Sequence, residues 1–547
     1  MTLAGIERPA FDVAVIGGGM AGAGIARDAA MRGLATVLLE RRDFAYGTTS
    51  KSSKLIHGGL RYLELFDFAL VRESLVERSR LERLAPHLVR PLPFLVPVYK
   101  GARRGMIRVR IGMRLYDLLT PGKTTGRYRG ISAEEALRLE PALGAEGLEG
   151  AGYYFDDLLL FPERLCLENV LSARRAGAAV ANYAEVVAMR RDAGGWTLEV
   201  RDALTGEGRR LAARIVVNAS GPWVDQVRRL AGVGEAGPRV LRTTKGIHVA
   251  VPRLTDRAIY LESERDGRMF FVIPWREFSW VGTTDTDYAG DLDRVVATRE
   301  EVDYLLASLE RALPGRGVTV DRVAYAWAGV RPLAFEAGKH ESAVSREHRI
   351  VAEADGSLLS ITGTKLTTYR SLAEEATDRV ARSLGRPSRS RTARVALDGA
   401  DTDGDRIEAR AWLDVSAESA RTGLSTRTLE RLVETYGRRV GSVLDLVQAD
   451  PRLGAPLCPH NPEVAAQVTI ACREEMARTL ADVMLRRTGL GQGVCLGRDC
   501  APQVARMMAA LLGWDERRVA QELADYDSIV ADTVAFREAP APAGARG

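Results

Sequence analysis

The sequence predicts a doubly wound α/β fold that is interleaved with a mixed β-sheet region and followed by a C-terminal all-helical domain. Three observations predict it. A glycine motif stands between an apolar strand and a helix near the start, strands and helices alternate through the middle, and strands become scarce beyond about residue 400. The chain has 547 residues, of which 46% are hydrophobic, so it can form large cores in more than one domain.

The glycine motif Gly17-x-Gly19-x-x-Gly22 follows a predicted strand at 11–16 and precedes a predicted helix. In that setting the three glycines permit a tight turn, close approach of a pyrophosphate and close packing of helix on strand. The helix N-terminus offers N–H groups and a positive dipole end to phosphates. Glu40 ends the next predicted strand, where its carboxylate can accept hydrogen bonds from a ribose. The segment therefore predicts a Rossmann-like dinucleotide site.

Two later segments favour FAD over NAD as the dinucleotide. A predicted strand, IVVNASG at 215–221, runs into the small residues Ala219 and Gly221, where the backbone can pass close to a cofactor. Another strand leads through Gly363, which opens a predicted helix ending near residue 384. The N-terminus of that helix would stabilise negative charge on a reduced flavin ring. We therefore expect non-covalently bound FAD.

These elements define the expected organisation of the chain. Cofactor-binding and substrate-binding regions are interleaved over residues 1–395, and a helical domain over 396–535 precedes a disordered tail at 536–547. Within the first region we expect the dinucleotide unit at 11–60, a substrate sheet mainly at 85–160 and 235–350, and a returning cofactor strand and helix at 357–384. Helical stretches of the C-terminal domain are predicted at 426–437, 462–490 and 502–514.

Composition narrows the function further. The net charge of +5 is too small to indicate nucleic-acid binding. The five cysteines are dispersed without a CxxC pair, and no His, Cys or carboxylate cluster has metal-ligand spacing, so we expect neither a disulfide framework nor a metal site. The first ten residues lack a signal-peptide pattern, and no apolar run has the length of a membrane span. We expect a cytoplasmic protein.

Nine ordered motifs between about residues 10 and 530 carry a resemblance to a known family: GTTSKSSKLIHGGLRYLE, NASGPWVD, KGIHVAV, FFVIPW, GTTDTDY, AGVRPL, SREHRI, GTKLTTYR and REEMARTLADVMLRRTGL. They resemble the FAD-dependent, aerobic-type glycerol-3-phosphate dehydrogenases. Ala21 departs from the family's pattern, which commonly has asparagine there. The resemblance implies oxidation of sn-glycerol 3-phosphate to dihydroxyacetone phosphate, by hydride transfer from C2 to flavin N5, with a membrane quinone as electron acceptor.

The resemblance also implies which residues bind the cofactor. The hydroxyl-rich loop at 48–53 would offer hydroxyl and N–H groups to the pyrophosphate or the flavin ring. The expected cofactor-binding residues are Gly17, Gly19, Gly22, Glu40, Thr48, Thr49, Ser50, Ser53, Leu55, His57, Gly58, Gly59, Val187, Ala219, Gly221, Gly363, Lys365, Leu366 and Thr367.

A substrate phosphate, with about −1.5 to −2 charge near neutral pH, requires cationic side chains. Arginine offers a fork of donors that matches a phosphate. Arg61, Arg331 and Arg346 occupy motif positions that the resemblance implies face the substrate, and Tyr62 can add a hydroxyl. We expect these four residues to bind the phosphate.

The oxidation also needs an acceptor for the proton of the C2 hydroxyl, and a histidine with a pKa of about 6.5 is suited to that task. His57, beside the flavin segment, and His248, in a predicted strand, are the two candidates, and the sequence leaves the choice between them open. Lys365, at the start of the late helix, can bind the substrate hydroxyl or the flavin carbonyl region. With Arg331 these residues form the predicted catalytic group.

The basic segment at 99–119 permits two interpretations. On a helix, Met106, Val109, Met113 and Tyr116 share one face, and the arginines lie mostly on the other side. Such a helix can lie on an anionic membrane surface, or it can pack its apolar face into the core. The resemblance favours the membrane, and with it a peripheral location at the inner face of the plasma membrane.

Other functions remain open. One is a glycerol-3-phosphate oxidase that reduces O₂ to H₂O₂, and another is a flavin oxidase of the amine-oxidising type, whose substrates would not need three arginines. A third is a non-catalytic FAD-binding protein, which the combination of His57, Lys365 and Arg331 disfavours. The basic helix and the long C-terminal domain favour the dehydrogenase over the oxidase. A homodimer is also compatible with the sequence.

Overall fold

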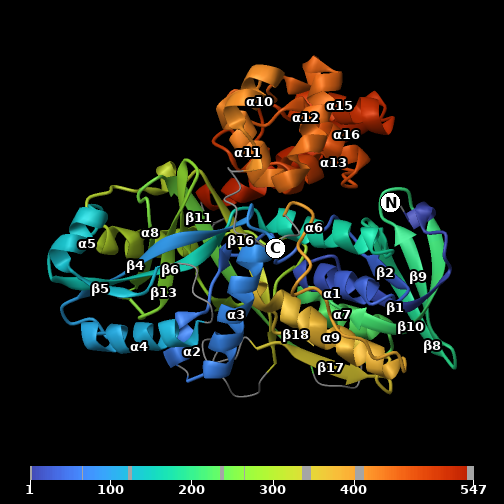
Figure 1. Ribbon diagram of the computed structural model, residues 1–547, viewed down its shortest axis with the longest axis horizontal. Helices are drawn as coiled ribbons and strands as arrows, with labels where there is room; N and C mark the ends of the chain where they lie inside the picture. The colour runs from blue at the N-terminus through green and yellow to red at the C-terminus, as the bar shows by residue number, and fades with distance from the viewer. Residues whose placement is uncertain are drawn as a thin grey trace, which may run out of the picture.

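The computed structural model describes residues 3–64, 66–120, 126–233, 239–263, 265–335, 347–400 and 412–538. Two β-sheets lie side by side, each with its own helices, and a group of C-terminal helices is set above both of them (Figure 1). The chain passes between the sheets repeatedly, because strands of the second sheet are inserted between strands of the first.

The first sheet corresponds to the predicted dinucleotide unit. Its strands run in the order β17-β18-β10-β1-β2-β7, parallel from β18 to β7, with β17 antiparallel at one edge and the hairpin β8-β9 attached to β10. The apolar runs of the parallel strands suit a sheet covered on both faces. The strand bounds are β1 Ala10–Ile16, β2 Thr36–Leu39, β7 Ala179–Ala181, β8 Ala184–Asp192, β9 Gly195–Asp202, β10 Gly208–Asn218, β17 Arg349–Glu353 and β18 Leu358–Thr362.

Helix α1 (Met20–Met31) packs between α6 (Pro162–Arg175) and α9 (Tyr369–Ser383) in one core cluster of this sheet. The approach of α9 is close, because a Cβ on Gly24 of α1 would lie 2.9 Å from the Tyr369 ring. The helix that was predicted to open at Gly363 begins later. Gly363 is in a left-handed turn with φ +68°, which a helix cannot continue, and α9 follows a short 3₁₀ turn at Leu366–Thr368.

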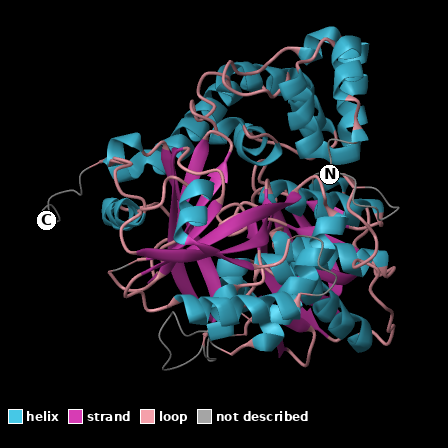
Figure 2. Ribbon diagram, turned by 60° about the vertical axis from the view of Figure 1, so that its left-hand side comes forward, coloured by secondary structure: helices cyan, strands magenta, loops and turns pink. Residues whose placement is uncertain are grey.

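The second sheet takes its strands from two separate stretches of chain, 55–159 and 241–334, and Figure 2 shows the strands of the molecule gathered at its centre with helices around them. Its order is β15-β11-β14-β13-β12-β4-β6-β3, with β16 paired to β11 and β5 to β6. The strand bounds are β3 Leu55–Ile56, β4 Val89–Tyr99, β5 Arg129–Ser132, β6 Leu148–Leu159, β11 Leu241–Pro252, β12 Ala258–Glu262, β13 Met269–Trp275, β14 Phe278–Gly282, β15 Thr286–Asp287 and β16 Tyr325–Ala334.

Helices cover this sheet and border the first one. They are α2 Leu60–Glu64, α3 Phe68–Leu84, α4 Met106–Leu119, α5 Ala133–Leu139, α7 Val224–Leu230 and α8 Arg299–Ala312. None of the helices in the described ranges has the length and apolarity to cross a membrane.

The C-terminal domain is helical, with α10 Val415–Thr422, α11 Thr426–Tyr436, α12 Val440–Ala449, α13 Ala465–Arg473, α14 Leu480–Asp482, α15 Ala501–Leu512 and α16 Glu516–Val534. The predicted helical stretch at 462–490 is interrupted at 474–479, where Met476 has φ +59°. The expected disordered tail is wrong at its start, because Phe536 is 2% exposed and packs into the core of the second sheet. Residues 539–547 lie outside the described part of the chain.

Candidate active site

A long cleft lies where the two sheets meet, with about 2000 Å³ of empty space, part of it open to solvent. One end is lined by β1, α1 and the end of β2, and the other by β11, β16 and the segment before α9. The loop at 46–53 runs along the wall between the two ends. A cleft of this shape can hold an extended ligand that reaches from the first sheet to the second.

The glycine turn forms one end of the cleft. Gly17 has φ +107°, and a Cβ there would lie 2.6 Å from the carbonyl oxygen of Ala219. A Cβ on Gly22 would lie 1.9 Å from the carbonyl oxygen of Gly17, so neither position tolerates a side chain. Helix α1 begins beyond Gly19, which has no side chain to cap it, and the N–H of its first residue, Met20, donates to Thr49 Oγ1. Gly19, Met20 and Ala21 line the cleft, so the helix presents its N-terminal end, with the positive end of its dipole, to a phosphate there.

Glu40 stands at the end of β2 and lines the same end of the cleft. Its carboxylate accepts hydrogen bonds from the backbone N–H of Gly18 (2.6 Å) and of Arg42 (2.8 Å). Burial raises the pKa of Glu40, and these two donors oppose that shift. The turn, the helix N-terminus and the fixed carboxylate fit the pyrophosphate and ribose of a dinucleotide such as FAD.

The loop at 48–53 joins the two sheets by hydrogen bonds. Thr48 donates to the carbonyl oxygen of Val330 (2.6 Å), and Thr49 Oγ1 accepts from the N–H of Met20 at the start of α1 (3.0 Å). Ser50 turns inward instead, toward the carbonyl oxygens of the loop itself. The loop therefore brings hydroxyl groups to the cleft and fixes the cleft's wall to both sheets.

Lys365 and Thr367 hold the backbone of His57. The Lys365 ammonium donates to the carbonyl oxygen of His57 (2.9 Å) and to Ser74 Oγ (2.9 Å), and it lies 5.2 Å from the centre of the Tyr62 ring. Thr367 Oγ1 accepts from the N–H of His57 (3.1 Å). Lys365 thus adds positive charge to the cleft wall while it orders the loop that carries His57.

Arg331 lies across the second sheet beside the cleft. It stands on β16 opposite Thr244 of β11, and its guanidinium covers Gly246, where a Cβ would lie 2.1 Å from Nη2. Asp285 accepts from Nη1 (2.9 Å) and Thr283 Oγ1 lies 2.9 Å from Nη2. These contacts fix the plane of the guanidinium, and the glycine provides the room in which it lies.

His248 is on the same face of β11, two residues beyond Gly246. Its side chain is buried and stacks on the Trp327 ring at 5.0 Å, and a hydrogen bond joins Nε2 to Ser53 Oγ (2.9 Å). Burial, helped by the charge of Arg331, lowers the pKa of His248 to about 3. Nδ1 is buried and has no hydrogen-bond partner in the described part of the chain.

The structure brings together most of the residues expected from the sequence. The cleft is lined by Gly17, Gly19, Glu40, Thr48, Thr49, Ser53, Leu55, His57, Ala219, Gly221, His248, Arg331, Lys365, Leu366 and Thr367.

The remaining expected residues are placed elsewhere. Gly22, Ser50, Gly58, Gly59, Tyr62, Val187 and Gly363 are not among the residues that line the cleft. Val187 is 37% exposed at the irregularity of β8 between Val186 and Ala188, and Val186 lines the cleft in its place. Gly58 follows His57 in the chain, and its N–H donates to Tyr116 Oη (2.8 Å), which fixes the backbone next to the cleft. The side chain of Arg61, and Arg346 as a whole, lie outside the described residues.

Sequence reasoning missed Lys51, which lines the cleft between the two ends. A Cβ on Gly329 of β16 would lie 2.6 Å from the Cβ of Lys51, so this glycine allows the lysine's approach. Burial lowers the pKa of Lys51 to about 8, and an anionic ligand would stabilise its charged form. The acids among the described lining residues, Glu40 and Glu185, are at the other sheet, so the Arg331 end favours an anion.

Two family models match the chain. "FAD dependent oxidoreductase" covers residues 12–370, and "C-terminal domain of alpha-glycerophosphate oxidase" covers residues 390–519. A "Glycerol-3-phosphate dehydrogenase" of Synechocystis is 38% identical over 95% of this chain and 96% of its own length. An "Aerobic glycerol-3-phosphate dehydrogenase" of Staphylococcus aureus is 36% identical over 88% and 86%, respectively.

Two solved structures are similar to this chain. The glycerol-3-phosphate dehydrogenase of Bacillus halodurans, solved as a complex with FAD, has a TM-score of 0.80 and 30% identity, over 98% of this chain and 97% of that one. The L-alpha-glycerophosphate oxidase of Mycoplasma pneumoniae is 17% identical, with a TM-score of 0.55 over 68% of this chain and 94% of that one. The second likeness concerns the fold alone.

Proposed function

The chain belongs to the family of FAD-dependent glycerol-3-phosphate dehydrogenases, and we propose that it oxidises sn-glycerol 3-phosphate to dihydroxyacetone phosphate with FAD as its cofactor. The observation that carries the proposal is the guanidinium of Arg331, which lies over Gly246 and beside His248 at the end of a dinucleotide cleft. Glycerol 3-phosphate carries a phosphate, which a guanidinium can bind, and an oxidisable alcohol a few bonds away, whose proton a histidine can accept.

In this proposal Arg331 binds the substrate phosphate, and its fixed plane orients the rest of the molecule. His248 accepts the proton of the C2 hydroxyl. FAD, when bound, supplies the acceptor for the hydride that leaves C2. Lys365 holds the His57 loop in place and adds positive charge where negative charge develops. The two histidines thus have separate roles, His248 at the substrate and His57 in the cofactor wall.

The test is the anaerobic addition of glycerol 3-phosphate to the purified flavoprotein. We expect loss of the absorbance of the oxidised flavin, at a rate that saturates with substrate. Glycerol is the matched control, because it has the same carbon skeleton and no phosphate, and it should react far more slowly. An unchanged flavin spectrum with glycerol 3-phosphate would support the non-catalytic FAD-binding alternative instead.

We propose a membrane quinone as the electron acceptor, and the outer surface of α4 supports this. The face that was predicted to be apolar packs inward, with Met113 and Tyr116 at 3% and 2% exposure. The outer face carries Ile107, Ile111 and Leu118, which are 75%, 64% and 81% exposed. Three exposed arginines, at 108, 110 and 114, lie between them.

The neighbouring loop continues this surface. Phe66 and Phe68 are 78% and 40% exposed and contact each other edge to face. Figure 1 places α2 beside α4, and the two helices are in contact. Exposed aliphatic and aromatic side chains interleaved with arginines are typical of a surface that inserts shallowly into an anionic bilayer. Peripheral binding there would bring the enzyme to a lipid-soluble quinone.

The double variant Ile107→Ser/Leu118→Ser is expected to bind vesicles of phosphatidylglycerol at least about 10-fold more weakly, since each aliphatic side chain contributes about 1.5–3 kcal/mol when fully buried. Vesicle co-sedimentation at low salt measures this. Val494→Ser is the matched control, because Val494 is 54% exposed on the C-terminal domain. Equal binding of the double variant and the wild type would refute the assigned surface.

Peroxide yield per turnover, with and without a quinone analogue, separates the quinone from O₂ as acceptor.

A further inference from the structure

The C-terminal domain makes a buried contact with the cofactor cleft through Asp43. Asp43 lies three residues beyond Glu40, at the start of the loop that lines the cleft, and its side chain is 0% exposed. Two of its partners, Arg486 and Arg487, are more than 400 residues away in the chain. A charged side chain in such a position requires a complete set of hydrogen-bond donors.

Asp43 has that set. Arg486 Nε donates to Oδ2 (2.6 Å), and Arg487 donates from Nη1 to Oδ2 (2.7 Å) and from Nη2 to Oδ1 (2.9 Å). Asn182 Nδ2 adds a donor to Oδ1 (3.0 Å). The two arginines hold the pKa of Asp43 well below its usual range, although burial opposes them, so the carboxylate stays ionised.

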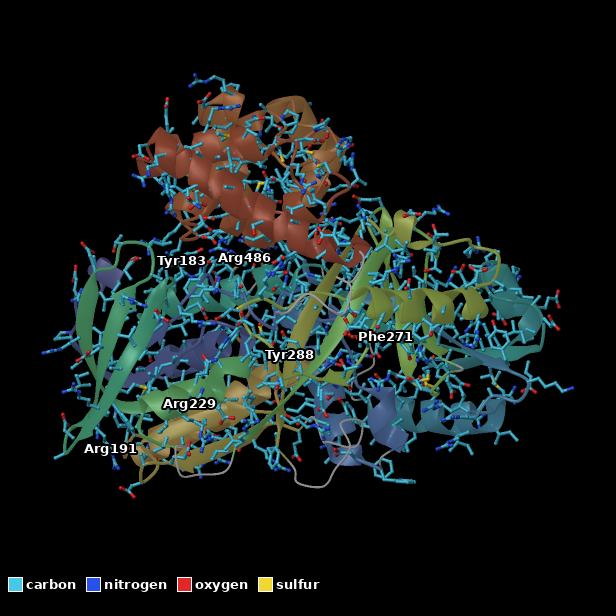
Figure 3. All side chains as sticks on the ribbon, turned by 180° about the vertical axis from the view of Figure 1, so that it is seen from behind. Tyr183, Arg191, Arg229, Phe271, Tyr288 and Arg486 are labelled. Atoms are coloured by element: carbon cyan, nitrogen blue, oxygen red, sulfur yellow. The ribbon has the colours of Figure 1, made fainter. Side chains whose placement is uncertain are left out.

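The arginines are themselves held by both parts of the molecule. Asp482 accepts from Arg486 Nη2 (2.6 Å) and from Tyr183 Oη (2.7 Å), and Arg487 Nε donates to the carbonyl oxygen of Glu475 (3.0 Å). Figure 3 shows Tyr183 and Arg486 close together where the helical domain meets the first sheet. The guanidinium groups therefore have little freedom to follow Asp43 if it moves.

From Asp43 the constraint extends to the cleft. Phe44 is 1% exposed, and its ring fills the space beside Gly18, where a Cβ would lie 2.6 Å from it. Tyr46 lines the cleft, and the Arg486 guanidinium lies 6.0 Å from the centre of its ring. The loop between β2 and the hydroxyl-rich segment is thus fixed at its start by a domain that supplies no lining residue to the described cleft.

We propose that the C-terminal helical domain sets how tightly FAD is retained, with Arg486 and Arg487 as positioning residues that fix the loop at 41–53 through Asp43. The proposal rests on FAD binding alone and not on the identity of the substrate. An ordered loop loses less conformational freedom when the cofactor binds, so the bound state is favoured. Release of FAD requires the loop to loosen, which the buried ion pairs oppose.

The test compares Asp43→Asn with Asp202→Asn in the full-length holoenzyme. Asp202 is also buried and also pairs with an arginine of the C-terminal domain, Arg478 (2.9 Å), but it lies at the end of β9 and does not itself line the cleft. We expect Asp43→Asn to speed FAD release at least about 10-fold, measured by the rise of flavin fluorescence after dilution. Asp202→Asn should stay within about 2-fold of the wild type.

Three further measurements separate positioning from general destabilisation. Arg486→Lys keeps the charge and the Arg487 contacts, and it should release FAD at an intermediate rate even if Asp43→Asn folds poorly. Hydrogen exchange of the holoenzyme should increase in peptides covering 41–53 for both variants. With excess FAD, the kcat of Asp43→Asn should return to the wild-type value, because Asp43 does not touch the substrate. Equal FAD release by Asp43→Asn and Asp202→Asn, or unchanged release by Asp43→Asn, overturns the proposal.

Discussion

Replacing Arg331 with methionine is expected to lower kcat/KM for glycerol 3-phosphate by about 10²–10⁴-fold while FAD stays bound. Each charge-assisted hydrogen bond contributes about 1.5–3 kcal/mol, and two such bonds to one phosphate account for the range. Methionine keeps much of the side-chain volume and removes the charge. Steady-state kinetics measure the loss, and the flavin spectrum reports whether the cofactor remains.

The controls for Arg331 come from its surroundings. Glycerol should be oxidised equally slowly by the wild type and by Arg331→Met, since it has no phosphate to bind. The variant removes the nearer of two guanidinium groups that pair with the buried Asp285, the other being that of Arg268 at 3.8 Å, so Arg331→Met/Asp285→Asn should recover stability without recovering activity. Gly246→Ala moves the guanidinium without removing it, because a Cβ would lie 2.1 Å from Nη2. An intact kcat/KM in Gly246→Ala would show that the guanidinium's present position is not the active one.

Replacing His248 with glutamine is expected to slow flavin reduction by about 10²–10⁴-fold, the usual contribution of a positioned general base. Substrate affinity should change little, because the phosphate is bound elsewhere. Rapid mixing under anaerobic conditions separates the two quantities. His57→Gln is the matched variant: if it slows reduction as much as His248→Gln does while FAD stays bound, His57 is the base and the assignment here is wrong.

The pH dependence follows from the low pKa of His248, about 3. Arg331 contributes to that lowering, so a bound phosphate dianion, which offsets the guanidinium, should raise the pKa toward the range of an effective base. Without ligands, the unfolded state gains a proton below its pKa of 6.5 and the native state does not until about 3. His248 therefore destabilises the native protein as pH falls through this window, by up to about 1.4 kcal/mol per pH unit. Denaturant unfolding of the wild type should show this loss and His248→Gln should lack it.

The sequence predicted correctly those elements whose structure depends on residues close to one another in the chain. The glycine turn, β1 and β2 formed as expected, because Gly17 and Gly22 leave no room for a side chain and the flanking strands are mostly apolar. The motif FFVIPW, inside the stretch expected to form the substrate sheet, lies in β13. The stretch at 462–490 did not form one helix: the backbone turns at 474–479, where Met476 has φ +59°, and Glu475 in that turn pairs with Arg164 of α6 (2.7 Å). A contact of that sequence separation overrides helix propensity and leaves no local signal.

The residues of the candidate site also divide into those that the sequence identified and those that only the structure identifies. Residues in the glycine motif and the hydroxyl-rich loop could be assigned from spacing, whereas Gly246 and Gly329 could not. These two glycines matter because the side chains of Arg331 and Lys51 pack against them, and that packing depends on the pairing of β11 with β16. Which of Val186 and Val187 lines the cleft likewise depends on a register shift of β8 between Val186 and Ala188, and the sequence gives no sign of that shift.

The junction between Asp43 and the two arginines limits how small this enzyme can be made. The chain has an obvious point for cutting between the oxidoreductase part and the helical domain, and each piece has a core of its own. A fragment that ends there would nevertheless leave Asp43 and Arg164 without the partners that the helical domain supplies. Truncation at that point would then yield a protein that still binds FAD but releases it quickly.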